Sequence, residues 1–413
     1  MIEFDKFTLD NGLKVIVHRD ATTPLAAVNI LYNIGARDEN PDQTGFAHLF
    51  EHLMFGGSVN IPNYDEPLQQ VGGDNNAWTS NDVTNYYLTV PKENLETAFW
   101  LESDRMLSLD FTEKSLEVQK SVVIEEFKQH YFNQPYGDVW LHLRPLAYKK
   151  HPYQWATIGK CIEHIEEATL QDVKDFFFHH YAPNNAVLVV SGHVETEEVK
   201  QLAEKWFGPI ERRSIAPRNL PLEPKQTEFR SLRLERNVPY DAIYMAFHMG
   251  SRSDEDFYKV DLLSDILSNG QSSRIFQTLV KEKNLFSTID AYLTGDFDPG
   301  LFIVSGKLTE GVSMEDAEIA IWEVLNAVSE TKAGAYELQK VKNKVESTLV
   351  FSEISFLNKA MTLAQHEVNG DANDINLEVE KYNKVTTENL QEMARKILIK
   401  KNCSTLYYYA KKQ

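Results

Sequence analysis

Two histidines and a glutamate stand together in one short apolar stretch of the chain. They belong to the pentapeptide 48–52, His-Leu-Phe-Glu-His, inside the apolar run 46–55. On a helix, His48 and His52 would project about 40° apart, with Glu51 about 60° to the other side of His48. Burying three polar groups in so apolar a helix is costly unless something binds them. Because Zn²⁺ accepts neutral imidazole nitrogens, the stretch predicts two zinc ligands and a possible base.

A catalytic zinc site uses three protein ligands, so one more must come from elsewhere in the chain. A lone histidine on an apolar helix is more often satisfied by a backbone carbonyl, which is the alternative interpretation here. The order His-x-x-Glu-His is, however, the inverse of the commoner His-Glu-x-x-His and is itself a recognised catalytic motif. A short motif needs a third ligand in the right context before it carries weight.

The predicted helix 113–127 offers two adjacent carboxylates, Glu125 and Glu126. With Val122 set at 0°, the apolar positions of this helix fall between about 100° and 200°. Glu126 then lies at about 40°, bordering the buried face, whereas Glu125 lies at about 300° and points away. An isolated Glu-Glu pair is usually an ordinary surface pair. The two histidines favour Glu126 as the third ligand.

Charge and composition narrow the class of partner. The formal net charge of −19 argues against nucleic acid, which requires a basic face. An acidic cavity for basic substrates is one explanation, and a solvated surface is the simpler one. With no signal peptide and no long apolar run in the sequence, we expect no membrane partner and a cytoplasmic location, or a periplasmic one if a leader has been removed. Cys161 and Cys403 lack motif spacing and predict neither a disulfide nor metal ligands.

The order of predicted elements indicates an α+β fold with helices packed on a mostly antiparallel sheet. Asn-Gly at 11–12 predicts a hairpin. Further strands are expected at 14–17, 26–34, 84–90 and 186–191, and helices at 93–107 and 112–131. The segment 213–229 contains three prolines and no apolar period, which predicts a linker.

The pattern starts again after this linker. Residues 30–39 are echoed by 244–254, and with a two-residue gap 48–57 then falls on 261–270. In the second copy Asp261, Ser264 and Asp265 replace the two histidines and the glutamate. Chance similarity over a short window is the alternative to duplication. We predict two homologous domains related by internal duplication: a zinc-binding domain at 1–212, the linker at 213–229, and a domain without metal at 230–413.

These residues resemble the pitrilysin or insulinase-type inverted zinc metallopeptidases, and within them the mitochondrial processing peptidase-like branch. That family has His-x-x-Glu-His followed at long range by a zinc-binding glutamate, and His52 to Glu126 spans 74 residues here. Relatives often carry a further glutamate seven residues before the zinc glutamate, where this chain has Gln119. Further similar stretches lie at 73–79, 122–126, 151–153, 181–185 and 272–274.

The resemblance implies an endopeptidase that hydrolyses peptides or unfolded segments inside a clamshell chamber formed by two paired chains. His48, His52 and Glu126 would bind one Zn²⁺ per chain, and Glu51 would be the general base that activates the zinc-bound water. Asn76 and Ala77 match an edge segment that pairs with the substrate backbone, which is β-augmentation.

Two alternatives stay open at this point. The chain could be a noncatalytic core or assembly subunit, or the active half of a heterodimer with a related chain rather than a homodimer. In the second half, Arg252, Tyr258 and Arg274 are polar candidates for contact with substrate.

Overall fold

The structure is a computed structural model that describes residues 1–411. It separates into two compact units, and each unit draws on both halves of the sequence. The first unit comprises Met1–Lys128, Trp155–Leu220 and Val350–Leu377; the second comprises Gln129–Gln154, Pro221–Leu349 and the chain from Glu378 onward. The compact units therefore differ from the predicted sequence halves in two segments.

The first unit contains a six-stranded sheet with the order β1-β2-β6-β3-β5-β4. Neighbouring strands are antiparallel except for β2 and β6, which are parallel. The hairpin predicted at 11–12 joins β1 to β2, and Gly12 adopts a φ of 92° there. The strands are β1 (Asp5–Thr8), β2 (Lys14–Arg19), β3 (Leu25–Tyr32), β4 (Asp74–Thr79), β5 (Thr84–Pro91) and β6 (Ala186–Gly192).

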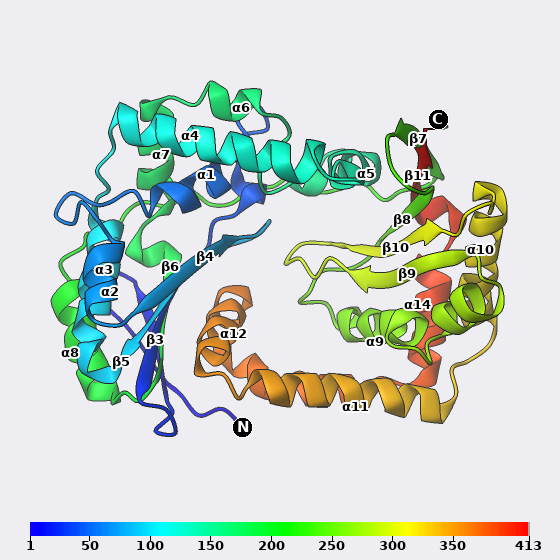
Figure 1. Ribbon diagram of the computed structural model, residues 1–413. Coiled ribbons are helices and arrows are strands. Elements are labelled where there is room, and N and C mark those ends of the chain that lie inside the picture. Colours follow the sequence, from blue (N-terminus) through cyan, green and yellow to red (C-terminus); the bar gives the residue numbers. More distant parts are fainter. Residues whose placement is uncertain (412–413) are drawn as a thin grey trace. The chain divides into compact units, whose positions relative to one another are not determined.

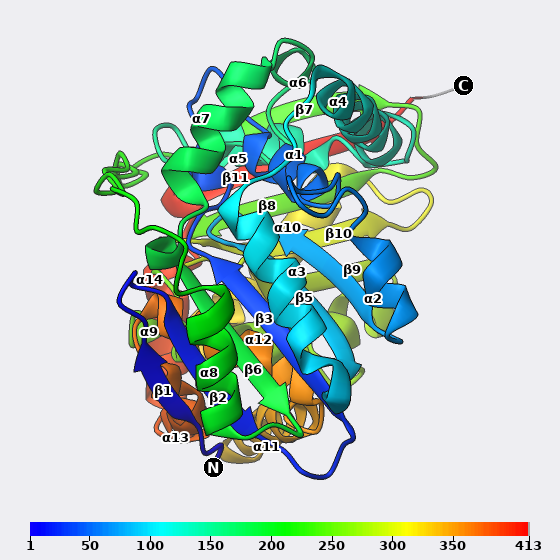
Figure 2. The same ribbon diagram turned by 90° about the vertical axis from the view of Figure 1, so that its left-hand side faces the viewer.

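Both faces of this sheet are covered by helices. The central strands β3 and β6 are buried along nearly their whole length, as strands covered on both faces are. Helices α3 and α8 pack on one face and α12 on the other (Figures 1 and 2). The helices of this unit are α1 (Phe46–Leu53), α2 (Asp65–Gln70), α3 (Leu95–Leu107), α4 (Glu113–Phe127), α6 (Glu163–Glu166), α7 (Leu170–His180), α8 (Thr196–Trp206) and α12 (Phe356–Asn369).

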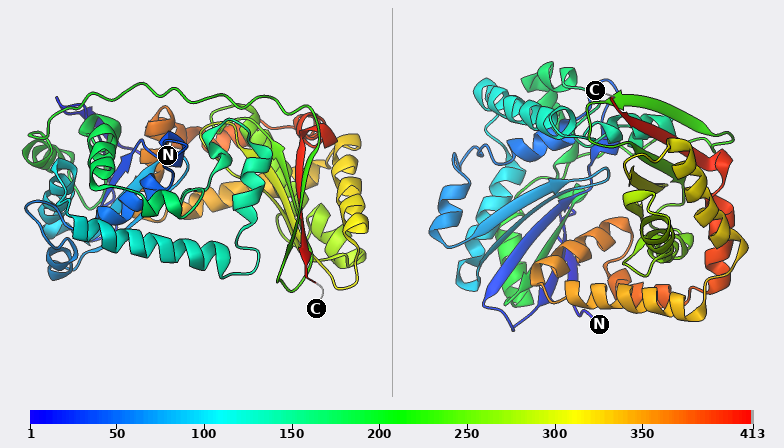
Figure 3. Two further views of the ribbon diagram at one scale, coloured as in Figure 1. Left: turned by 90° about the horizontal axis from the view of Figure 1, so that it is seen from above. Right: turned by 45° about the vertical axis from the view of Figure 1, so that its right-hand side comes forward.

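The second unit contains a five-stranded sheet with the order β7-β11-β8-β10-β9. Its single parallel pair is β7 with β11, which lie side by side in green and red in Figure 3. The strands are β7 (Arg230–Arg236), β8 (Ala242–His248), β9 (Phe286–Leu293), β10 (Leu301–Leu308) and β11 (Cys403–Ala410). The helices are α5 (Val139–Ala147), α9 (Asp256–Ser268), α10 (Met314–Glu330), most of α11 (Ala335–Ser352), α13 (Glu378–Asn383) and α14 (Thr387–Ile397).

The two sheets share one topology. The strands β2, β6, β3, β5 and β4 of the first sheet correspond in order and direction to β7, β11, β8, β10 and β9 of the second. Helix α1 follows β3 as α9 follows β8, which is the pairing that the sequence repeat predicted. Only β1 has no counterpart in the second sheet. The predicted α+β class with two homologous domains is confirmed.

The two halves of the sequence exchange helices between the compact units. Helix α5 comes from the first half of the chain but packs on β7, β8 and β11 of the second sheet. Helix α12 comes from the second half but packs on β3 and β6 of the first sheet. This exchange was not predicted, because a helix's apolar pattern shows that one face is buried without showing which sheet buries it.

The segment between α8 and β7 is an irregular ribbon without helix or strand beyond Ile210 (Figure 3). It is nevertheless fixed at both ends. Arg218 donates to Asp38 at 2.5 Å, and the Gln226 amide donates to the Cys403 carbonyl at 2.8 Å. Both cysteines are free thiols. Within residues 1–411, no helix combines the length and the apolar character needed to cross a membrane.

Candidate metal centre

The apolar face of helix α1 packs on a cluster of aromatic side chains. Phe50 packs against Tyr181 and Phe177, with ring centroids 4.5 Å and 5.9 Å away. Gly45 is the N-cap residue that precedes the helix. Its φ of 91° and its close approach to the Ile158 carbonyl leave no room for a Cβ, which would lie 2.5 Å from that oxygen. With Phe50 inward, the histidines project from the opposite side of the helix.

A buried carboxyl group, Glu39, holds the start of α1. Its two oxygens accept the backbone N–H groups of Gly45 and Ala47, each at 2.9 Å. The Trp155 indole donates a third hydrogen bond at 3.1 Å. Burial raises the pKa of Glu39 to about 8, against the three N–H donors, which lower it. Glu39 thus satisfies N–H groups that the first helical turn leaves without intrahelical partners.

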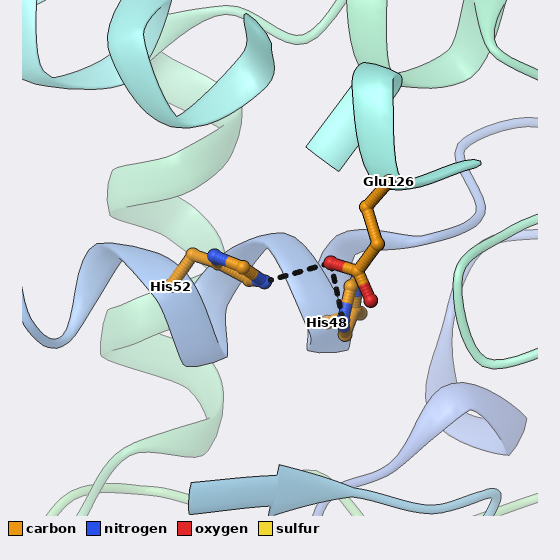
Figure 4. Close-up of side chains that lie close together, drawn as sticks. All are labelled: His48, His52 and Glu126. Atoms are coloured by element: carbon orange, nitrogen blue, oxygen red, sulfur yellow. Dashed lines mark ion pairs between the residues drawn. The ribbon is translucent and has the colours of Figure 1, made fainter. Parts of the chain in front are cut away.

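Three side chains converge above α1. His48 and His52 project from one face of the helix, and Glu126 reaches them from α4 (Figure 4). The Glu126 Oε2 atom lies 3.7 Å from His48 Nε2 and 3.4 Å from His52 Nε2. One ligand atom from each residue lies within 4.8 Å of the other two, and this is the group in the described part of the chain that could hold a metal ion. The side chains are 13%, 25% and 30% exposed, so solvent reaches the centre.

This donor set fits Zn²⁺. Imidazole nitrogen and carboxylate oxygen are both usual zinc ligands, at about 2.0–2.1 Å from the metal. Tetrahedral coordination at that distance places neighbouring ligand atoms about 3.3 Å apart. The separations of 3.4 Å and 3.7 Å are close to this value. The Glu126 carboxylate therefore already lies, relative to each histidine, near the position that a tetrahedral ion requires, and the three ligand atoms lie within 4.8 Å of one another.

The two candidate glutamates of α4 have different surroundings. Glu125 forms a solvent-exposed ion pair with Lys128 at 2.7 Å and takes no part in the triad, whereas Glu126 does. Gln119 lies two helical turns before Glu126 and so on the same face of α4. The helix changes to π geometry at Lys128–Phe132, where a continuous α-helix to 131 was expected, and the boundary of the first compact unit lies at Lys128.

Glu51 lies on α1 between the two histidines but outside the triad. Its Oε2 atom accepts the hydroxyl hydrogen of Thr79 at 2.5 Å. Burial raises the pKa of Glu51, and the hydrogen bond from Thr79 partly offsets this rise. A carboxyl group with a raised pKa beside a metal-compatible triad is suited to accepting and returning a proton.

Asn76 and Ala77 lie on β4, the edge strand of the first sheet. β4 pairs with β5 on one side only, and the Ala77 N–H is taken by the side-chain oxygen of Asn76 at 2.8 Å. Helix α1 packs against this strand. The structure thus brings the predicted edge segment next to the helix that carries His48 and His52.

Sequence reasoning missed Thr79, Glu39 and the buried ion pair of Arg37 with Asp82, which measures 2.9 Å. The contacts of Thr79 with Glu51 and of Arg37 with Asp82 join segments that are distant in sequence, whereas Glu39 bonds the nearby residues Gly45 and Ala47. A weak signal existed for Glu39, since it is an acidic residue shortly before an expected helix N-terminus. For Thr79 and Arg37 the sequence offered no local signal.

In the second unit, the counterparts of the metal residues make other bonds. Asp261 accepts the Tyr382 hydroxyl at 2.5 Å, and Asp265 accepts the Asn269 amide at 2.6 Å. Burial raises the pKa of Asp265 to about 6. The polar candidates of this half are bonded within the unit: Arg252 and Tyr258 to Glu378, and Arg274 to Glu337.

Two sequence models of one family match the chain. The one described as "Insulinase (Peptidase family M16)" matches residues 14–159, which include the triad and Glu51. The one described as "Peptidase M16 inactive domain" matches residues 167–345. The match to the inactive domain begins within the first half and includes Asp261, Ser264 and Asp265, which stand where the first half has its metal residues.

Individual relatives span most of the chain. The zinc protease PqqE of Helicobacter pylori is 28% identical over 373 residues, which is 89% of this chain and 84% of the relative. The mitochondrial-processing peptidase subunit beta of Saccharomyces cerevisiae is 26% identical over 365 residues, covering 83% of this chain and 77% of its own. The crystal structure of a protease from H. pylori superposes with a TM-score of 0.92 at 26% identity, covering 99% of this chain and 100% of the other. The chain therefore belongs to the insulinase-type M16 peptidase family, on the branch that includes the mitochondrial processing peptidases.

Proposed function

We propose that this chain is a zinc-dependent endopeptidase that binds one Zn²⁺ and hydrolyses peptides or unfolded polypeptide segments. The observation that carries the proposal is the preformed triad of His48, His52 and Glu126, with the carboxylate of Glu51 on the same helix but not within the triad. A purely structural zinc site would be closed by four protein ligands, whereas three ligands leave a position for catalysis.

The chain's own residues supply the proton chemistry. Zinc held by the triad would act as a Lewis acid that polarises a carbonyl and eases the deprotonation of water. Glu51 takes the proton from the attacking water as the new carbon–oxygen bond forms. It returns this proton to the leaving nitrogen as the carbon–nitrogen bond breaks, so the carboxylate is restored.

Substrate binding is assigned to the edge of β4. An extended peptide that adds to this edge gains main-chain hydrogen bonds without demanding a particular sequence. Asn76 and Ala77 would provide these bonds, and the Asn76 side chain would have to release the Ala77 N–H first.

The assembly we favour is a pair of identical chains enclosing a peptide-binding chamber, in a cytoplasmic setting, with neither nucleic acid nor membrane as a partner. Pairing with a different, related chain is the second candidate, because the yeast relative is named as one subunit of a processing peptidase. If the chain acts in a heterodimer, the purified chain alone should cleave weakly. If it acts as a homodimer, the purified chain should be active without a partner.

The decisive experiment measures cleavage of an unstructured peptide library together with metal content. The purified chain should cleave with zinc and lose cleavage on chelation. Glu51→Gln should lower cleavage by about 10²–10⁴-fold while zinc stays near one per chain. Glu125→Gln removes an exposed carboxylate of the same type and serves as the matched control.

A noncatalytic assembly subunit is the competing function. It predicts that neither the wild type nor Glu51→Gln cleaves the peptides, with or without a related partner chain. Wild-type cleavage that survives in Glu51→Gln would contradict the assignment of the base.

A further inference from the structure

We propose that Thr79 is a positioning residue that orients the Glu51 carboxylate, so that the edge strand and the general base form one unit. This inference rests on the proposed function, because it assigns a role within that reaction. The starting observation is the 2.5 Å hydrogen bond from the Thr79 hydroxyl to Glu51 Oε2. Within residues 1–411, the structure gives the second oxygen, Oε1, no hydrogen-bond partner. Thr79 therefore holds Oε2, and Oε1 remains available to accept a proton.

Thr79 is itself rigidly held. It is the last residue of β4 and pairs with Thr84 across the ladder. The turn that follows is closed by the Ser80 N–H donating to the Val83 carbonyl at 2.9 Å. The Ser80 hydroxyl oxygen accepts two further backbone N–H groups, from Asp82 and Val83, each at 3.1 Å.

One short segment, 35–39, connects this turn to α1. The Ala36 and Arg37 N–H groups donate to the carbonyls of Ser80 and Asn81, at 3.1 Å and 2.8 Å. A Cβ on Gly35 would lie 2.5 Å from the turn backbone, so the two segments touch with no space between them. Glu39, at the other end, holds the first turn of α1. The hydroxyl of Thr79 and the carboxylate of Glu51 are therefore brought together by a frame that does not depend on their own hydrogen bond.

The hydrogen bond suits both protonation states of Glu51. In the carboxylate, Oε2 accepts from Thr79 and Oε1 is free to take a proton from water. In the acid, Oε1 carries that proton toward the leaving nitrogen, and Oε2 still accepts from Thr79. Thr79 keeps its own proton throughout, so it adds no proton-transfer step and serves only to fix the direction in which Oε1 points.

The link to substrate follows from strand geometry. Ala77 lies two residues before Thr79 and so on the same face of β4. A peptide strand that pairs at Ala77 is thus held in register with the residue that orients the base. Substrate binding at the edge of β4 and the orientation of Glu51 therefore both depend on the hairpin formed by β4 and β5.

The test compares Thr79→Val, which keeps the shape but removes the donor, with Thr79→Ser, which keeps the donor. Thr79→Val should lower kcat by about 10–100-fold with little change in KM or zinc content, and Thr79→Ser should retain kcat within about 3-fold. Thr84→Val is the matched control, because its hydroxyl donates to the Ile34 carbonyl and does not contact Glu51. It should lower the melting temperature without a selective loss of kcat.

A readout independent of activity is the orientation of Glu51 in crystals of the zinc-free protein. The carboxylate should turn away from β4 in Thr79→Val and stay in place in Thr79→Ser. Wild-type kcat in Thr79→Val, or equal losses in the Val and Ser variants, would overturn the positioning role while leaving the endopeptidase proposal intact. Absence of chelator-sensitive cleavage in the wild type would overturn both.

Discussion

At the scale of single residues, the choice between Glu125 and Glu126 was decided by about 100° of helical rotation. The sequence was sufficient to predict which of the two glutamates meets the histidines, because both lie on one regular helix with a clear apolar face. Glu126 meets His48 and His52, while Glu125 pairs with Lys128 at the surface. Thr79 and Arg37 were beyond prediction, because their partners become neighbours only when the sheet has formed.

The two glutamates therefore make a paired test of the metal site. Glu126→Gln should lower zinc affinity by about 10-fold or more, because a neutral amide replaces an anionic ligand. Glu125→Gln should leave affinity unchanged, since its exposed ion pair contributes little. Competitive titration with a chromophoric chelator measures both. Equal zinc affinity in the two variants would mean that Glu126 is not a ligand.

At the scale of elements, two carboxylates anchor helices: Glu39 anchors α1, which carries two residues of the triad, and Asp138 anchors the exchanged helix α5. Glu39 holds the first turn of α1 through both oxygens. Asp138 precedes α5 and binds Tyr408 at 2.7 Å and Arg236 at 2.9 Å, which ties the exchanged helix to two strands of the second sheet. The helices themselves were predictable from periodicity. The contacts of Asp138 join segments that are distant in sequence and were not predictable, whereas Glu39 bonds nearby residues and had a weak local signal.

Replacing Glu39 tests the first anchor. In Glu39→Gln, one of the two oxygens becomes an NH₂ group that faces a backbone N–H. We expect a loss of about 1–3 kcal/mol in the free energy of unfolding, since a buried donor is left unsatisfied. Urea titration at neutral pH measures the loss, with the exposed Glu211→Gln as control. A loss no larger than that of the control would show that Glu39 does not secure the helix.

The second anchor gives a pH dependence. Burial alone would raise the pKa of Asp138, but hydrogen bonds from His142, Tyr408 and Arg236 outweigh it and lower the pKa to about 2. A depressed folded-state pKa stabilises the fold above the ordinary value of 3.8, and this contribution disappears as pH falls toward 2. The free energy of unfolding of the wild type should exceed that of Asp138→Asn by about 2 kcal/mol at pH 6. The gap should narrow below about pH 4 in urea titrations; a gap that stays constant to pH 3 would contradict the assignment.

At the scale of the whole molecule, the helix exchange separates the compact units from the sequence halves. Both the duplication and the loss of metal residues in the second copy were predictable, since they leave marks in the local pattern. The exchange of helices leaves no mark in the local sequence pattern. Beneath α5, Val139 and Leu143 share one buried cluster with Ala246, Ile303 and Leu406 of the second sheet.

This arrangement predicts the behaviour of separated halves. Fragment 1–212 would lack α12 on its sheet, and fragment 230–413 would lack α5 on its own. Each buried aliphatic side chain exposed in this way costs about 1.5–3 kcal/mol. We expect each fragment alone to bind a hydrophobic dye and melt without a cooperative transition, and the mixture to regain cooperative melting. A cooperatively folded fragment 1–212 would show that the exchange is dispensable.

The exchange also bears on how such a chain can be inherited. A duplicated gene usually leaves one copy free to decay, and the copy without metal residues would be the obvious one to lose. Here a deletion of that copy would also remove α12, the helix that covers one face of the first sheet. The second half can lose its chemistry residue by residue, but it cannot be discarded as a piece. A chain with this fold therefore has to keep the second copy for as long as the first copy, which carries the triad, is needed.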